Sequence, residues 1–274
     1  AFIYAKDEPS PEELPEVREF ARLVRRADRD LRVLVTASLD PSLEGLTGIW
    51  SPNINCLFDR PLATYCTSTV PLTKYGKARK SGARMWWYQS CGSHGCGEQE
   101  ALDASARRYF RGWPSYMVDH DGPLNRAMGA LAYRHGIEGE LYFNTVEAYH
   151  DGKGGRGDPW KSVRRFAGNG DGTLFYPGTP ERIGGKTHVP VESLRLKHIR
   201  DGLEDYELLT LARSVGLQKE ADALASSLAP QPFEITRDWR KWEDGRRKLL
   251  QAVAARARTA GEFPRGPAVT APLK

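Results

Sequence analysis

Residues 2–9 read Phe-Ile-Tyr-Ala-Lys-Asp-Glu-Pro, and the interpretation of the whole chain starts from them. The first three are apolar residues that favour β-structure, so the segment predicts a buried strand. Because Pro9 has no N–H group to continue a sheet ladder, the strand ends before it and leaves Asp7 and Glu8 at its carboxyl end. In a sheet covered by helices, that edge binds ligands and carries catalytic side chains. The competing interpretation is a solvated turn in which Glu8 or Ser10 caps the next helix.

The composition excludes several classes of protein. With 274 residues and 40% hydrophobic side chains, the chain can form one large domain or two small ones. No apolar run reaches the roughly 18 residues of a membrane helix, and no signal-peptide pattern opens the sequence, so an exported protein would be present here in its mature form. The net charge is +5, and the arginine pairs are dispersed along the chain. We therefore predict a globular protein that binds neither membranes nor nucleic acids.

Four cysteines lie in one stretch of the chain: Cys56, Cys66, Cys91 and Cys96. Their even number and Gly-rich surroundings favour two short disulfides, most simply Cys56–Cys66 and Cys91–Cys96, and hence an oxidising, extracytoplasmic compartment. Free thiols or a metal site with His94 remain open, because pairing does not follow from sequence alone. The spacing does not match a zinc finger, and we predict no metal and no cofactor.

The hydrophobic periodicity alternates between strands and helices. We predict an amphipathic helix over residues 11–28, followed by strands over 31–37, 48–54, 83–90 and 139–146, with shorter helices at 73–80, 98–110 and 123–133 between them. Residues 147–189 are Gly-rich and predicted to be irregular. Helices over 191–214, 217–228 and 234–259 follow. This order divides the chain into a strand-rich domain over 1–190, a helical segment over 191–262 and a disordered tail over 263–274.

All five predicted strands end in polar or aromatic residues. A carboxylate pair beside aromatic rings on one rim is typical of a sugar site, because a pyranose ring offers an apolar face and several hydroxyls. Parallel strands with such a rim suggest a (β/α) barrel or a part of one. A closed barrel would need eight strands, and the sequence supplies five.

Several short sequence motifs occur one after another along the chain. They are Tyr4-x-x-Asp7-Glu8-Pro9, Ile49-Trp50-Ser-Pro52, Met85-Trp-Trp-Tyr88, Gly139-Glu-Leu-Tyr142, Asp158-Pro-Trp160, Gly170-Asp-Gly-Thr-Leu-Phe-Tyr-Pro-Gly178 and Ser193-Leu-Arg-Leu-Lys-His-Ile-Arg-Asp-Gly-Leu-Glu-Asp-Tyr206. Over residues 2–212 the chain resembles the catalytic domain of glycoside hydrolase family 123, the β-N-acetylgalactosaminidases. It also resembles uncharacterised domains that share the last motif. The last two motifs are the most specific.

The resemblance implies a (β/α)8 barrel of the TIM type, of which this chain contains strands 4–8, followed by C-terminal helices. It implies a glycosidase that removes terminal N-acetylhexosamine, most simply β-N-acetylgalactosamine, from a glycan. The implied mechanism is retaining and substrate-assisted, with the sugar's own acetamide as nucleophile. Glu8 is then the general acid/base, and Asp7 orients the acetamide and stabilises the oxazolinium intermediate. Adjacent strand residues point to opposite sides, which argues against the ordinary pairing of a nucleophile and an acid.

Further site residues are expected at the other strand ends. The aromatic candidates are Trp50, Trp87 and Tyr88, and the polar candidates are Asn53, Gln89 and Asn144. Core packing is the competing role for each tryptophan. Because strand residues alternate, Trp86 and Trp87 cannot both face the site.

The implied barrel lacks its first three strands in this sequence, and an open sheet would expose an unpaired edge. An upstream segment or a second chain could supply them. The alternative is a non-catalytic carbohydrate-binding or structural relative of the fold. A third interpretation is a disulfide-stapled cell-surface interaction domain, which predicts no pocket at Asp7 and Glu8.

Overall fold

A computed structural model describes the chain except for residues 61–65, 67–68, 91–102, 151–153, 166–167 and 261–274. Its centre is a parallel sheet with the strand order β1-β2-β3-β4-β5. The strands are β1 (Phe2–Lys6), β2 (Arg32–Val35), β3 (Ile49–Trp50), β4 (Arg84–Tyr88) and β5 (Gly139–Leu141). All of the pairings are parallel, as the alternation of strands and helices predicts.

The sheet is curled into half of a barrel. Phe2 on β1 and Trp86 on β4 are separated by two strands, yet their ring centroids lie 5.1 Å apart in an edge-to-face contact. Leu34 on β2 is fully buried. Only a curved sheet brings its first and fourth strands into contact, so the chain forms a mixed α/β fold with part of a (β/α) barrel.

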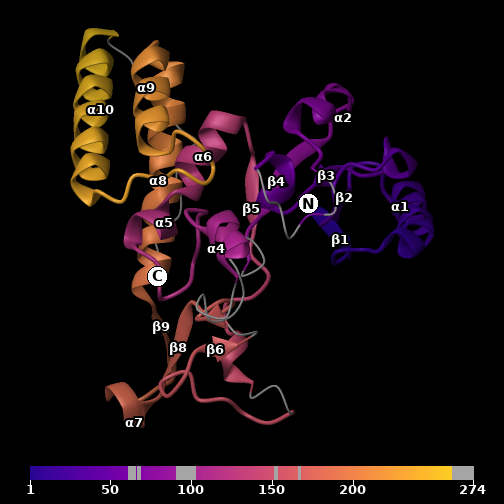
Figure 1. Ribbon diagram of the computed structural model, residues 1–274, viewed down its shortest axis with the longest axis horizontal. Coiled ribbons are helices and arrows are strands. Elements are labelled where there is room, and N and C mark those ends of the chain that lie inside the picture. Colours follow the sequence, from indigo (N-terminus) through magenta and orange to yellow (C-terminus); the bar gives the residue numbers. More distant parts are fainter. Residues whose placement is uncertain (61–65, 67–68, 91–102, 151–153, 166–167, 261–274) are drawn as a thin grey trace.

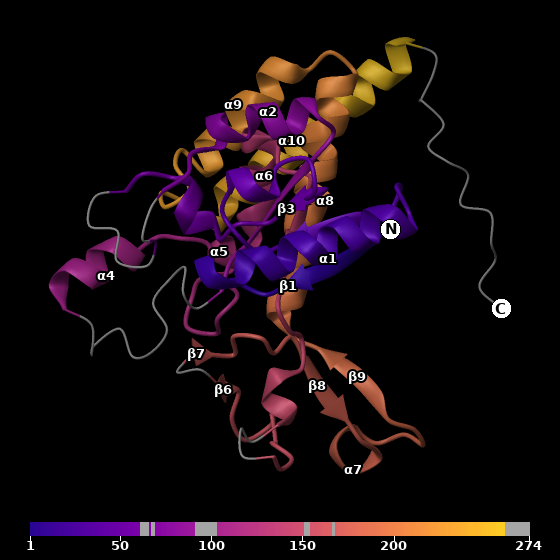
Figure 2. The same cartoon turned by 90° about the vertical axis from the view of Figure 1, so that its right-hand side faces the viewer.

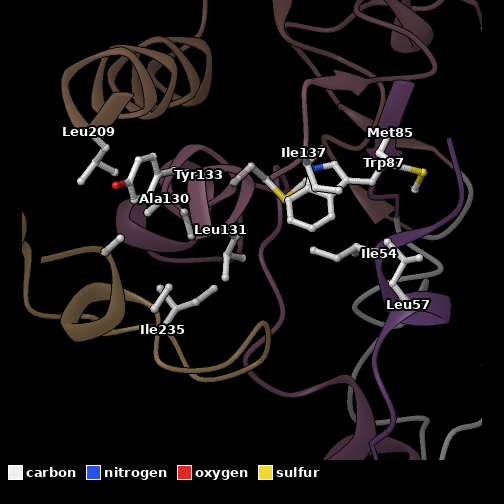
Figure 3. Packing of buried hydrophobic residues seen from close by; sticks show 14 of the residues in the cluster. Ile54, Leu57, Met85, Trp87, Ala130, Leu131, Tyr133, Ile137, Leu209 and Ile235 are labelled. Atoms are coloured by element: carbon white, nitrogen blue, oxygen red, sulfur yellow. The ribbon is translucent and has the colours of Figure 1, made fainter. Parts of the chain in front are cut away.

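Helices cover the convex face of the sheet and continue into a bundle (Figure 1). They are α1 (Leu14–Ala27), α2 (Gly76–Lys80), α4 (Ala104–Phe110), α5 (Gly122–Arg126), α6 (Met128–His135), α8 (Leu194–Ser214), α9 (Gln218–Leu228) and α10 (Trp239–Ala260). Short 3-10 helices precede α1, at Pro11–Glu13, and α2, at Leu72–Tyr75. Buried residues of β4, such as Met85 and Trp87, meet Leu131 and Ile137 beside α6 in one core (Figure 3).

The first turn of the fold follows from local chemistry. Ser10 begins the 3-10 helix, and its N–H donates to Glu13 Oε2 at 2.8 Å. Helix α1 then buries Val17, Ala21 and Val24, the apolar stripe that the sequence shows. Since Ser10 is the N-cap of the 3-10 helix, Glu8 does not cap it.

Residues of the C-terminal motif pack α8 closely against α5 and α6. A Cβ atom on Gly202 would lie 2.3 Å from the carbonyl oxygen of Arg126, and one on Gly129 would lie 1.8 Å from the carbonyl oxygen of Gly202. Helix α8 therefore crosses α5 and α6 at backbone distance. One turn later, Asp205 accepts two hydrogen bonds from the buried Arg126 guanidinium, at 2.5 and 2.9 Å. These residues join the half-barrel to the helices.

Several predicted boundaries need correction. The strands predicted at 48–54 and 139–146 are shorter, as β3 and β5 show, because Pro52 and the loop after Leu141 leave the ladder. Helix α10 begins at Trp239 rather than at residue 234. The region predicted to be irregular over 147–189 contains the antiparallel pairs β6 (Arg164–Arg165) with β7 (Gly168–Asn169), and β8 (Phe175–Gly178) with β9 (Val189–Glu192), and the short helix α7 (Pro180–Ile183).

One disulfide, Cys56–Cys66, is present as predicted. Cys91 and Cys96, together with His94, lie outside the described residues. In the part of the chain that the structure describes, no helix is long and apolar enough to cross a membrane.

Candidate active site

Asp7 and Glu8 lie directly after β1, at the carboxyl edge of the sheet, and both are exposed. Glu8 has a φ of 40°, the left-handed region that a residue with a side chain rarely adopts. Such backbone strain concentrates at functional sites. Here the strain has a structural cause, because the Glu8 N–H turns back to donate to Thr36 Oγ1 at 2.8 Å.

Asp7 is oriented by two hydroxyl groups. Tyr4 donates to Asp7 Oδ1 at 2.6 Å, and Thr36 Oγ1 lies 3.1 Å from the same oxygen. The Tyr4 and Thr36 oxygens are 2.9 Å apart. Tyr4 and Thr36 each have one hydroxyl proton, but the three oxygens make three close contacts. The short contact between Tyr4 and the Asp7 carboxylate uses the Tyr4 proton. Burial, followed by the hydrogen bond to Asp7, raises the pKa of Tyr4, so Tyr4 remains a donor at neutral pH.

Glu8 is held by a residue from the far side of the curled sheet. The hydroxyl of Tyr88, at the end of β4, donates to Glu8 Oε1. The Tyr88 side chain is 7% exposed, and Tyr88 forms a parallel bridge with Asn53. The fold therefore joins Glu8 and Tyr88, which are 80 positions apart in the sequence.

The nearest lysine is kept away from the acids. Lys6 Nζ lies 2.9 Å from both Glu13 Oε1 and Glu16 Oε2 on the first helical turns. These two pairs hold the one cation of the opening strand on the helix side. Tyr4, Thr36 and Tyr88 supply neutral hydroxyl donors to Asp7 and Glu8.

The two predicted tryptophans lie elsewhere. Trp50 and Trp87 are both 0% exposed and belong to the core behind the sheet. Trp50 packs edge-on against Tyr75, and Trp87 packs against Phe58 and His135. Strand alternation sends these rings toward the helices, so neither presents a face to a ligand at the rim.

The predicted polar ligands are near the rim but serve other purposes. Asn53 is buried and accepts from the Asn55 N–H at 3.0 Å. Asn144 donates to Glu147 Oε2 at 2.5 Å and accepts from two backbone N–H groups, so it shapes the loop after β5. Gln89 is fully buried, and neither polar atom of its amide has a hydrogen-bond partner among the described residues.

Sequence reasoning did not assign Thr36 to the site. This residue follows β2 and contacts Tyr4, Asp7 and the backbone of Glu8. Its signal was positional, since Thr36 is the first polar residue at the carboxyl end of the neighbouring strand. Tyr4 belongs to the opening motif and shares a face of β1 with Phe2.

Two sizeable hollows lie away from the acids. One, of about 520 Å³, lies at the amino-terminal edge of the sheet, where Arg25, Arg32 and Lys77 line it. The other, of about 490 Å³, lies on the β8–β9 hairpin beside Phe175 and Pro177. Asp7 and Glu8 line neither of them, and they occupy the open rim of the half-barrel. Among the described residues, no three His, Cys, Asp or Glu side chains converge on a possible metal position.

The family assignment follows from comparison of the whole sequence. The family model described as the catalytic domain of glycoside hydrolase 123 matches residues 2–212, from β1 to the last turns of α8. The chain belongs to glycoside hydrolase family 123. No protein with a curated description matches it. The match contains the acid pair, Thr36 and Tyr88, and it also covers the residues that dock α8. As a member of a glycoside hydrolase family, the protein is a glycosidase in general terms, with a glycan as substrate.

A further acid of this family 123 domain lies on β5, the strand that pairs with β4. Glu140 on β5 is partly buried opposite Trp87, and it accepts a hydrogen bond from Tyr116 at 2.7 Å. Burial raises the pKa of Glu140 to about 7. In the same cluster, the Tyr142 hydroxyl donates to Asp171 at 3.0 Å and accepts from the Gly172 N–H at 2.7 Å. This cluster attaches the Gly-Asp-Gly loop to β5.

The raised pKa of Glu140 makes folding stability depend on pH. A carboxyl whose pKa is higher in the folded state contributes its full stability below the unfolded value near 4.5, and this contribution is lost as the pH rises to about 7. The shift corresponds to about 3 kcal/mol, and partial exposure reduces the expected effect to about 1–2 kcal/mol. We expect Glu140→Gln to raise the free energy of unfolding by that amount at pH 8 and to leave it unchanged at pH 4.5.

Urea unfolding of the two proteins at both pH values measures this difference. Glu138→Gln is the matched control, because Glu138 is exposed and two residues away. An equal stability change at both pH values, or the same change in the control, would contradict a raised pKa of Glu140 in the folded protein.

Proposed function

We propose that the protein removes terminal N-acetylhexosamine, most simply β-N-acetylgalactosamine, from glycans by a retaining, substrate-assisted mechanism. The observation that carries the proposal is the acid pair at the carboxyl rim of the half-barrel, where Tyr4 and Thr36 hold Asp7 and where Tyr88 holds Glu8. Family membership supports a glycan as the substrate.

In the first step, Glu8 gives its proton to the oxygen of the glycosidic bond. The acetamide oxygen of the sugar attacks the anomeric carbon from the other side, and the bond to the leaving group breaks. Asp7 accepts a hydrogen bond from the acetamide N–H and stabilises the positive charge of the oxazolinium ring. Glu8, now ionised, takes a proton from water, which opens the ring and leaves the anomeric configuration retained.

The contacts of the two acids fit these different roles. The donors on Asp7 Oδ1 fix the direction of the carboxylate and leave Oδ2 for the acetamide. The hydrogen bond from Tyr88 to Glu8 Oε1 holds the Glu8 carboxyl group at the rim, where we place the proton transfer. In an extended strand, the Asp7 and Glu8 side chains would point to opposite faces. The left-handed backbone at Glu8 changes their relative direction. We include Asp7, Glu8, Tyr4, Thr36 and Tyr88 in the proposed site and leave out the buried Trp50 and Trp87.

We also propose that a further segment or a second chain completes the barrel. In the described part of the chain, β1 pairs only with β2 and β5 only with β4, so each keeps an open edge. Phe2 and Tyr4 on the concave face are 47% and 40% exposed. Additional parallel strands would pair with these edges and cover these rings. The Cys56–Cys66 disulfide supports an extracytoplasmic location.

A comparison of two substrates tests the function. The protein should hydrolyse 4-nitrophenyl N-acetyl-β-galactosaminide at least about 100-fold faster, by kcat/KM, than 4-nitrophenyl β-galactoside, because only the first carries the internal nucleophile. Release of 4-nitrophenol measures both rates. Equal rates would exclude substrate assistance, and no release from either would favour a non-catalytic relative of the family.

A further inference from the structure

The segment between β5 and α8 forms an arm, which we define as residues 142–192. It leaves the sheet after Leu141, at the edge where the parallel strands end and where Asp7 and Glu8 also lie. Figures 1 and 2 show the β8–β9 hairpin and α7 at the bottom of the molecule, apart from the sheet and the helical bundle. The arm therefore extends from the rim that carries the acids.

An aromatic pair with an exposed tryptophan and a partly buried tyrosine lies on this arm. Trp160 is 39% exposed, and its ring centroid is 5.0 Å from that of Tyr176 on β8, with the two planes inclined by 43°. Tyr176 points to one face of the hairpin, whereas its neighbours Phe175 and Pro177 line the hollow on the other. The pair thus forms a separate surface.

Trp160 is held rigidly although it is exposed. Its indole N–H donates to the carbonyl oxygen of Pro177 at 2.8 Å, and its backbone N–H donates to Asp158 Oδ1 at 3.1 Å. Asp158 Oδ2 in turn accepts from Arg182 of α7 at 2.8 Å. A ring fixed in this way loses little conformational entropy when a ligand stacks on it. Core packing does not explain a ring that is both fixed and exposed.

The surroundings of the ring are polar. Arg182 and Lys161 are exposed, and their side-chain nitrogens lie 2.8 and 3.9 Å from Asp158 Oδ2. A flat apolar face beside cationic donors and a carboxylate suits a ring with one apolar face and a periphery of hydroxyls. A pyranose has this chemistry. An apolar protein partner would leave the charged groups without water or ligands.

We propose that Trp160 and Tyr176 form a second sugar-binding surface, which holds a unit of a longer glycan whose terminal sugar is processed at Glu8. The inference rests on the proposed function for its choice of glycan. It predicts that the arm discriminates oligosaccharides from monosaccharides. Trp160 supplies the stacking face, and Arg182 and Lys161 donate to hydroxyls of the same unit.

Isothermal titration with a β-linked tetrasaccharide that ends in N-acetylgalactosamine tests this surface. We expect the tetrasaccharide to bind at least about tenfold more tightly than free N-acetylgalactosamine, and Trp160→Ala to remove this advantage. Trp160→Phe should retain most of it, because a phenyl ring also stacks. The matched control is Trp239→Ala on α10, a tryptophan that is 61% exposed and lies outside the arm. The control should bind like the protein with Trp160 intact.

The outcomes separate this inference from the proposed function. All of these titrations use the Glu8→Gln background, so that the tetrasaccharide is bound but not hydrolysed. An inactive acid pair therefore leaves the effect of Trp160→Ala on binding unchanged. Equal affinities of the Trp160→Ala and Trp239→Ala variants for the tetrasaccharide would overturn the inference. So would equal affinities of the protein with Trp160 intact for the tetrasaccharide and the monosaccharide.

Discussion

Replacing Glu8 by Gln should lower kcat/KM for aryl N-acetyl-β-galactosaminides by about 10²- to 10⁴-fold, the range for loss of a positioned general acid. The amide cannot give up a proton, but it keeps an oxygen that accepts from Tyr88, so the rim should remain folded. The loss should grow as the leaving group becomes more basic, because a poor leaving group depends most on protonation. A 2,4-dinitrophenyl substrate should therefore lose least and a disaccharide most.

Two further variants sharpen this result. Tyr88→Phe removes the donor but keeps the acid, so we expect a loss of about tenfold rather than the full effect. Glu12→Gln is the matched control, because Glu12 is an exposed acid in the 3-10 helix, only four residues after Glu8. A Glu8→Gln protein that hydrolyses both the 2,4-dinitrophenyl substrate and the disaccharide at the wild-type rate would show that another group donates the proton.

Much of the fold follows from periodicity, since each strand and helix of the half-barrel has its own hydrophobic pattern. The β8–β9 hairpin could not be predicted from periodicity, because Pro177 and Pro190 pair with each other and no alternating pattern surrounds them. Prolines in a sequence argue against strands. Whether such residues pair in a hairpin depends on the opposite strand, and a local sequence pattern does not contain that information.

The site was predictable in part for a similar reason. Asp7, Glu8 and Tyr88 could be predicted to lie at one rim because each stands at the end of a recognisable strand, and Tyr88 does contact Glu8. Trp50 and Trp87 were assigned to the site although they lie in the core. Alternation along a strand shows that adjacent side chains point to opposite faces of the sheet, but it does not show which face meets the ligand. Thr36 was missed because its role depends on three contacts to β1. Such contacts exist only after the strands pair.

Asp7→Asn has the second large expected effect, and it examines the other half of the mechanism. Asn keeps an oxygen that accepts from Tyr4 and Thr36, so its position should not change. It lacks the negative charge that stabilises an oxazolinium ion, and a charge of this kind in an active site contributes roughly 10²- to 10³-fold. Asp59→Asn, at an exposed position after the first disulfide cysteine, is the matched control.

The most direct measurement is a titration of the wild-type, Asp7→Asn and Asp59→Asn proteins with the galacto-configured thiazoline, a stable mimic of the cyclic intermediate. The account predicts that the wild-type protein and the Asp59→Asn control bind it at least about 100-fold more tightly than they bind N-acetylgalactosamine. It predicts that Asp7→Asn loses this preference. A wild-type protein that binds the thiazoline no better than the free sugar, or an Asp7→Asn protein that binds it as well as the wild type does, would contradict the assignment.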